Sequence, residues 1–247
     1  MDLRKKHFSL IMVFVALCTM ILSCNFDRTE EKTSLLSQDY GIEPESLLDA
    51  IGSGAHNAFV PLDTEPERIP PDQQIPVNWT QADYLTIANA LSEFVWEETL
   101  EGWQLNSMVF LLGCADFDVG FQNGRFRFFK NARISEHEIR IMRLIDIDPR
   151  SKFINVTEVK YEPKLVDWKS IDIQQNQLSA DEVLQSAENA GGQQQRLSVK
   201  NACNISLLLS PDYANYNGWE VDYTRRDDNI SIFHVQIDPY TGEIHFP

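Results

Sequence analysis

The sequence predicts an α+β fold made of two tandem units, each a helix followed by an antiparallel sheet. Three observations support this prediction. A helix with an N-terminal capping pattern occurs twice, β-type segments follow each helix, and each series of strands ends in Asp-Pro, a turn and a further short strand. The matching order indicates a duplicated unit. A coincidental succession of these elements within one larger α+β domain is the alternative.

The first 23 residues have the pattern of a secretion signal. Three basic residues precede an apolar run that extends from Phe8 to Leu22. A run of about 15 residues fits a signal peptide and is short of the roughly 20 residues that a permanent membrane-spanning helix needs. The run ends in Ile21-Leu22-Ser23-Cys24, which resembles the lipobox of bacterial lipoproteins.

The lipobox resemblance implies a lipid-anchored protein. In that family the thiol of the cysteine, here Cys24, is alkylated by diacylglycerol, the chain is cut before it, and the new amino group is usually acylated, for example with palmitate. Two or three acyl chains anchor a protein stably, where a single chain is marginal. We therefore expect residues 1–23 to be removed, and Cys24 to hold the protein on the extracytoplasmic side of the cell membrane or outer membrane. An ordinary signal peptide that happens to contain a cysteine is the alternative.

The chain carries an excess of acidic residues. It has 21 Lys and Arg against 37 Asp and Glu, and removal of the leader takes three basic residues and one acidic residue, which leaves a net charge of −18. This charge argues against nucleic acid as a partner and against electrostatic docking to anionic lipid head groups. A solvated surface is sufficient to explain it.

Two cysteines remain in the globular part of the mature chain, because Cys18 leaves with the signal and Cys24 is lipidated. In an oxidising compartment Cys114 and Cys203 could form one disulfide that closes a loop of about 90 residues, worth about 4 kcal/mol on the chain-entropy model. Two separately buried thiols are an equally good interpretation.

We expect residues 24–78 to be a flexible tether followed by a proline-rich linker. Residues 25 to about 42 are polar and acidic, which is typical of a tether. A short helix is predicted from Glu43 to Ile51. Five prolines then occur between Pro61 and Pro76, in a stretch that can form neither a helix nor a central strand. The compact region is therefore expected to begin near Trp79.

The first α+β unit is predicted over residues 79–165. Thr80 is a candidate N-cap with Asp83 three residues on, and apolar residues follow at helical spacing from Tyr84 to Val95. Strands are expected near Gln104 to Leu112, Gly124 to Lys130 and Glu138 to Asp148, with a short strand after Asp148-Pro149.

The second unit is predicted over residues 175–247. Ser179 and Glu182 have the spacing of a capping box, and Gly191-Gly192 is expected to end the helix. Strands are expected at Arg196 to Leu209, Trp219 to Thr224 and Ile230 to Asp238.

The second unit resembles a PepSY domain. The features that carry the resemblance are Leu178-Ser179-Ala180-Asp181-Glu182, Gly191-Gly192, Trp219-Glu220-Val221 and the run from Ile237 to Ile244, because the last hairpin of that family typically has the sequence V-D-x-x-T-G-E-V. The resemblance is clearest in residues 178–247 and weaker in residues 79–157. It implies PepSY/cystatin-like units, which are small non-catalytic α+β modules found in peptidase propeptides and in cell-envelope proteins.

The last turn of this motif has a physical rationale. Asp238 and Thr241 can accept backbone N–H bonds across the bend, and Gly242 can supply a positive φ. In the first unit, Ser151-Lys152 occupies the position in the turn that Thr241-Gly242 has in the second unit.

The sequence contains no recognisable catalytic motif, and we expect no metal and no cofactor. Cys114 or Cys203 could serve as a nucleophile with His137 or His234 as its base, but apolar strand-like surroundings usually make a thiol inert. We therefore expect a non-catalytic binding or regulatory lipoprotein whose partners are the membrane, through its lipid, and an envelope peptidase or another protein. A structural or interaction lipoprotein without a peptidase is the second hypothesis, and an enzyme of unrecognised type is the last.

Overall fold

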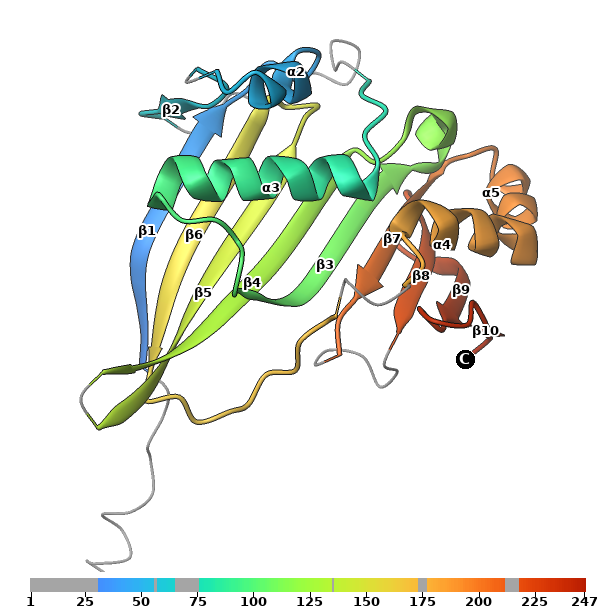
Figure 1. Cartoon of the computed structure of the whole chain (residues 1–247). Coiled ribbons are helices and arrows are strands. Elements are labelled where there is room, and N and C mark those ends of the chain that lie inside the picture. Colours follow the sequence, from blue (N-terminus) through green and yellow to red (C-terminus); the bar gives the residue numbers. More distant parts are fainter. Residues whose placement is uncertain (1–30, 56, 65–75, 135, 173–176, 212–217) are drawn as a thin grey trace, which may run out of the picture.

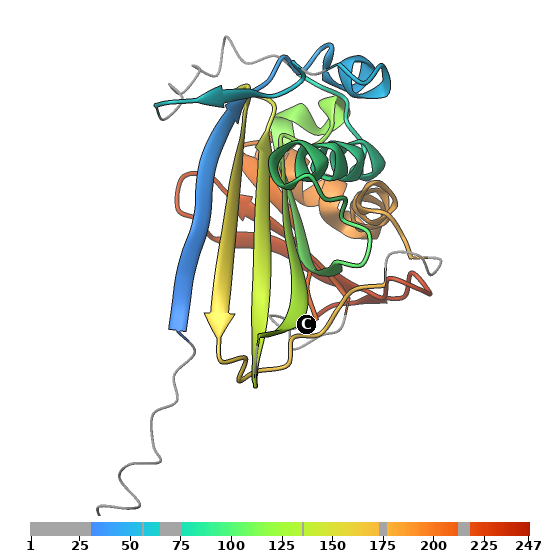
Figure 2. The same ribbon diagram turned by 60° about the vertical axis from the view of Figure 1, so that its left-hand side comes forward.

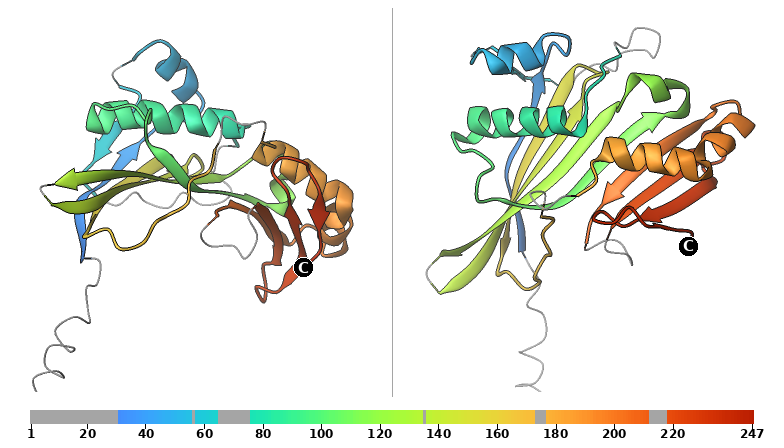
Figure 3. Two further views of the ribbon diagram at one scale, coloured as in Figure 1. Left: turned by 60° about the horizontal axis from the view of Figure 1, so that its bottom comes forward. Right: turned by 45° about the vertical axis from the view of Figure 1, so that its right-hand side comes forward.

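One antiparallel sheet organises the whole protein. The computed structural model describes residues 31–55, 57–64, 76–134, 136–172, 177–211 and 218–247. Within them, ten strands pair in the order β10-β9-β8-β7-β3-β4-β5-β6-β1-β2. The helices lie on one face of this sheet (Figure 1). The sheet twists strongly, so that β8 and β9 run at a steep angle to β5 and β6 (Figures 2 and 3).

The first half begins with the predicted helix. A capping box starts it, because Thr80 Oγ1 accepts the Asp83 N–H (3.4 Å) and Asp83 Oδ2 accepts the Thr80 N–H (2.8 Å). The buried face of this helix includes Tyr84 and Leu91, which pack on the sheet. The elements are α3 (Gln81–Trp96), β3 (Gln104–Gly113), the 3-10 helix η2 (Cys114–Val119), β4 (Asn123–Ile134), β5 (His137–Asp148) and β6 (Phe153–Glu162).

The second half repeats this order on a smaller scale. Ser179 and Glu182 form the predicted capping box, with the Ser179 N–H donated to Glu182 Oε2 at 2.8 Å. The elements are α4 (Ala180–Ala187), the π-helix η3 (Glu188–Gly192), α5 (Gln193–Ser198), β7 (Cys203–Leu209), β8 (Trp219–Arg225), β9 (Ser231–Ile237) and β10 (Ile244–His245).

The prediction that Gly191-Gly192 ends the second helix is wrong. Gly191 has φ 126° and kinks the chain, but α5 then continues as far as Ser198. The residues of α5 are mostly Gln, Arg and Leu, which favour helix. Strand β7 consequently begins at Cys203 and not at the predicted Arg196.

The prediction of a flexible tether is also wrong for residues 31–41. They form β1 (Glu31–Gly41), which pairs antiparallel with β6 from Glu31↔Glu162 to Gly41↔Phe153. The backbone of β1 is held in the sheet by its pairing, whereas most of its side chains are exposed to solvent. An ordered strand of this kind can have a polar sequence, and a polar sequence also predicts a tether. After β1 come α2 (Leu47–Gly52), which overlaps the predicted short helix but begins four residues later and ends one residue beyond it, and β2 (Val60–Leu62). Most of the proline-rich stretch lies outside the described residues.

The two halves meet where β3 pairs with β7. The pairing runs from Met108↔Leu209 to Gly113↔Asn204. One hydrophobic core contains residues of both halves, among them Tyr84, Phe110, Ile205 and Trp219. The α+β class is therefore confirmed, whereas the strands of the two expected units belong to a single sheet. Among the described residues, no helix is both long and apolar enough to cross a membrane.

Candidate binding groove beside the Asp-Pro turn

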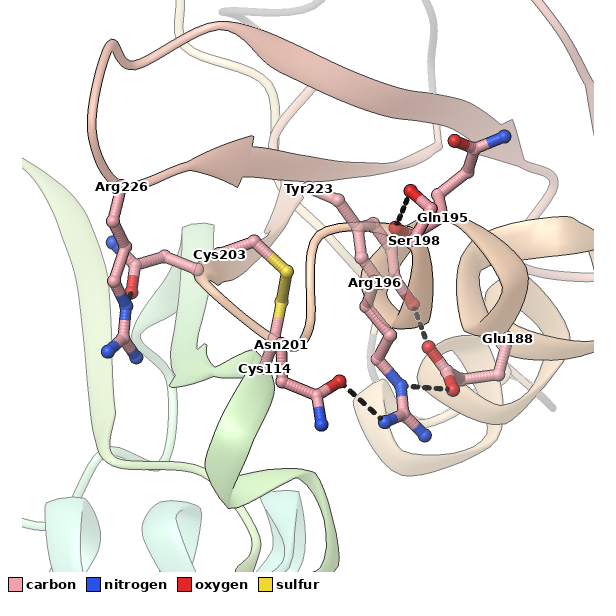
Figure 4. The surroundings of a disulfide bond; sticks show 10 residues. Cys114, Glu188, Gln195, Arg196, Ser198, Asn201, Cys203, Tyr223 and Arg226 are labelled. Atoms are coloured by element: carbon pink, nitrogen blue, oxygen red, sulfur yellow. Dashed lines mark hydrogen bonds and ion pairs between the residues drawn. A yellow bond between two sulfur atoms is a disulfide. The ribbon is translucent and has the colours of Figure 1, made fainter.

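The predicted site residues fall in three places. Cys24 lies outside the described residues. Cys114 and Cys203 are joined in a disulfide with their Cα atoms 5.2 Å apart (Figure 4). Cys114 follows β3 and Cys203 begins β7, so the bond crosses the line where the two halves of the sheet meet. Asp238, Thr241 and Gly242 lie together in the turn between β9 and β10.

A buried acid lies close to the disulfide (Figure 4). The side chain of Glu188 is 4% exposed and accepts two bonds, one from the Tyr223 hydroxyl and one from Arg196 Nε, each 2.8 Å long. Burial raises the pKa of Tyr223, and the adjacent Glu188 carboxylate raises it further. Arg196 also stacks on the Phe117 ring, 4.5 Å from its centroid. This network packs the second helix against β8 and against η2 of the first half.

Glu188 is not among the site residues predicted from the sequence, although its position carries a signal. Glu188 follows Ala180 and Leu184 at intervals of four residues, so it lies on the apolar stripe of the helix. A glutamate on the apolar side of a helix is either buried with a hydrogen-bonding partner or lies where the helix ends. Here Arg196 and Tyr223 are the partners.

The turn after β9 has the chemistry that the motif predicts. Asp238 Oδ1 accepts the N–H groups of Tyr240 (2.8 Å) and Thr241 (2.7 Å), and Gly242 has φ 73°. Thr241 Oγ1 accepts the Glu243 N–H (3.2 Å). The backbone bond from Thr241 is the main cause that holds the pKa of Asp238 below its usual range. The turn is therefore fixed by its own side chains.

The same turn positions the start of α4. The Leu178 N–H donates to the Pro239 carbonyl (2.7 Å), and Trp219 Nε1 donates to the Leu178 carbonyl (3.2 Å). A Cβ at Gly242 would lie 3.4 Å from Leu178 Cδ1, so the turn also packs against this side chain. The motif thus joins the last hairpin, β8 and the second helix.

The corresponding turn of the first half has a similar geometry. Asp148 Oδ1 accepts the Ser151 N–H (3.0 Å), and Lys152 has φ 57° at the position that Gly242 occupies in the second half. The Lys152 carbonyl accepts the Ile42 N–H (2.9 Å). This turn therefore fixes the chain that leads from β1 to α2.

A groove lies next to the second turn. We call residues 163–172, which leave β6 and lie beside the start of β3, the strap. Its Ile171 N–H donates to the Leu105 carbonyl (2.7 Å), and Asn106 Nδ2 donates to the Lys169 carbonyl (2.9 Å). A pocket of about 500 Å³ lies between the strap, α3 and the start of β3. A smaller pocket of about 60 Å³ shares Ser170 and Ile171 with it and extends to Pro239 and Tyr240. We call the two together the strap groove.

The lining of the strap groove suits an apolar side chain with a basic neighbour. Leu85, Leu105 and Phe128 line the large pocket together with Trp103. The Arg143 guanidinium stacks 3.9 Å from the centroid of the Trp103 ring, so this wall is held in place. Two carboxylates, those of Glu101 and Asp172, lie at the exposed margin. An open pocket with an apolar wall and polar groups at its margin has the character of a binding surface.

The structure does not bring together the cysteine and histidine residues that the sequence offered as a nucleophile and its base. Across the ranges that the structure describes, no three His, Cys, Asp or Glu residues gather closely enough to hold a metal ion. His137 is in β5 and His234 in β9, which are separated by four strands in the sheet order. Neither cysteine of the described chain is a free thiol, because Cys114 and Cys203 are bonded to each other.

Comparison with protein families identifies the second half. Residues 177–244 match the family model for the peptidase propeptide and YPEB domain, PepSY. This segment is a PepSY domain. It contains α4, α5, β7, β8, β9 and the Asp238 turn, and it supplies Gln177, Pro239 and Tyr240 to the strap groove. Searches among curated proteins and among solved structures found no match for the chain.

Proposed function

We propose that this protein is a non-catalytic, lipid-anchored module of the cell envelope that binds and regulates a peptidase. The observation that carries the proposal is the PepSY domain at residues 177–244, a family named for peptidase propeptides. The strap groove is the surface through which the partner is recognised. It receives an apolar side chain of the peptidase, and the exposed Glu101 carboxylate at its margin favours a basic residue beside it.

The anchor part of the proposal rests on the lipobox-like run that ends in Cys24. Replacement Cys24→Ser should abolish incorporation of labelled fatty acid and leave the leader uncleaved, because the acylated thiol is the substrate of the cleavage. Replacement Cys18→Ser, six residues earlier in the leader, is the matched control and should keep the label. Metabolic labelling followed by gel fluorography measures both. A Cys24→Ser variant that matures and stays in the membrane as before would show that the anchor is wrong.

We propose further that the first half is a diverged second PepSY-like unit. Its capping box, its helix-then-strands order and its Asp148 turn correspond to those of the PepSY domain. The two helices also meet by their N-termini: the Gln81 N–H donates to Asp181 Oδ2 (3.0 Å), and the Ala180 N–H donates to Gln81 Oε1 (2.7 Å). Together with the antiparallel β3–β7 pair, this contact gives the halves a head-to-head arrangement.

Filling the strap groove tests the binding function. Ser170 is exposed and lines both pockets, so Ser170→Trp should occlude them without disturbing the core. Soluble protein that starts at Asn25 is added to detergent-solubilised envelopes of the producing cell, and hydrolysis of fluorogenic casein is followed. We expect dose-dependent suppression by the unmodified protein, and suppression weakened by roughly tenfold or more in the variant, the usual effect of losing a central contact.

The matched control is Ser37→Trp, which places the same side chain on β1, away from the groove. It should suppress hydrolysis as the unmodified protein does, and both variants should give the thermal unfolding midpoint of the parent. Absence of suppression by the unmodified protein would contradict the peptidase link and favour the structural-lipoprotein hypothesis. Equal suppression by the two variants would show that the partner binds elsewhere.

A further inference from the structure

The length of the N-terminal segment limits how the molecule can sit on a membrane. Six residues separate Cys24 from Glu31, the first residue of β1. Even a fully extended chain from Cys24 to Glu31 spans no more than about 25 Å. An acyl chain on Cys24 would therefore hold the beginning of β1 close to the bilayer.

Other parts of the structure lie at the end of the sheet where β1 begins. Strand β1 begins where β6 ends, because Glu31 pairs with Glu162. The adjoining ends of β4 and β5 lie at this end too, with Ile134 opposite His137 (Figures 1 and 2). The start of the strap is tied to the hairpin by the Lys164 N–H, which donates to the Glu138 carbonyl (2.7 Å). The hairpin tip and the start of the strap therefore face whatever Cys24 is attached to.

Large aliphatic side chains are exposed at this end. Ile134 at the hairpin tip is 54% exposed, and Leu165 and Val166 in the strap are 46% and 55% exposed. The strap is held there, since the buried Arg140 guanidinium donates to the Val166 carbonyl. We call Ile134, Leu165 and Val166 the aliphatic tip.

The charges at this end do not favour an electrostatic contact. Lys164 is paired with Glu138 (3.4 Å) and with Asp167 (2.7 Å), so its charge is compensated. Exposed Glu31 and Lys32 begin β1 with opposite signs. A surface that has charges of both signs and exposed aliphatic groups suits the boundary between lipid head groups and acyl chains. At that boundary the burial of apolar area supplies the binding energy.

We propose that the aliphatic tip inserts into the head-group region of the bilayer to which the protein is tethered. The occupant of this surface is therefore lipid, and the inference rests on the proposed lipid anchor at Cys24. The insertion fixes the orientation of the molecule: the strands stand on the membrane, and α2 with β2 at the opposite end of the sheet points away from it (Figure 1).

Fluorescent reporters at two equally exposed positions test this orientation. Ile134→Cys places a reporter on the aliphatic tip, and Val60→Cys places one on β2; the two native side chains are both 54% exposed. The mature lipidated protein, which begins at Cys24, is labelled with the environment-sensitive dye NBD and reconstituted in phosphatidylcholine vesicles that contain doxyl-labelled lipid. We expect a blue shift of emission and quenching by the doxyl lipid at position 134, and neither at position 60. Val166→Cys provides a second reporter that should behave like the one at position 134.

Vesicle flotation separates this inference from the proposed anchor. Protein that does not float with the vesicles would contradict the anchor itself. Protein that floats but gives the same emission and the same quenching at positions 134, 166 and 60 would overturn the membrane-inserted tip and leave the anchor standing. Quenching at position 60 alone would show the opposite orientation.

Discussion

Replacing Cys114 and Cys203 together by alanine is expected to lower the free energy of unfolding by about 4 kcal/mol. The bond connects residues 89 positions apart, so it removes many conformations from the unfolded chain. It also crosses the line between the halves, where β3 and β7 provide one ladder of backbone bonds. Both side chains are buried, and alanine adds no unsatisfied polar group. Urea denaturation of soluble protein that starts at Asn25 measures the loss.

Alkylation gives an independent check of the same bond. Soluble protein without Cys24, unfolded and alkylated with no reductant, should show no modified cysteine by intact mass, and two after reduction. The single variant Cys114→Ala should lose nearly as much stability as the double variant, because either replacement opens the bridge. Two modified thiols before reduction would support the alternative of two separately buried thiols.

The helix starts were predictable because their signals are local. Thr80 with Asp83 and Ser179 with Glu182 each act within three residues, and the capping bonds form between those same residues. The turn motif is local in the same sense, since Asp238 binds the backbone of the next residues. Sequence patterns of this kind depend little on the rest of the fold.

The strand β1 and the continuous sheet were not predictable in this way. The alternation that marks a half-buried strand is missing from β1, because it lies near one end of the sheet and buries only Tyr40. The β3–β7 pair joins residues about a hundred positions apart and has no periodic signature. The strap groove is assembled from α3, β3, the strap and the Asp238 turn, and only the last of these carries a motif. Tertiary packing decides all three features.

A second large effect is expected at Glu188. Replacement Glu188→Leu should destabilise the protein by about 3 to 5 kcal/mol, because it leaves the Arg196 guanidinium buried without its carboxylate. Arg196 is 12% exposed and contributes one of the two bonds that Glu188 accepts. The Tyr223 hydroxyl loses its acceptor as well. Glu188→Gln keeps an acceptor of nearly the same shape, so it should cost less than the leucine variant in the same urea titration.

The double variant Glu188→Leu with Arg196→Met separates the cost of the charge from the cost of packing. A buried ion pair replaced by apolar residues of similar volume leaves no unpaired charge, and Met can keep contact with the Phe117 ring that Arg196 now covers. The double variant should therefore recover most of the stability that Glu188→Leu loses. If the single and double variants are equally stable, the loss of stability comes from the Tyr223 hydroxyl, which no longer has its acceptor, and from poorer packing around it. A Glu188→Leu protein as stable as the parent would mean that the network contributes nothing to folding.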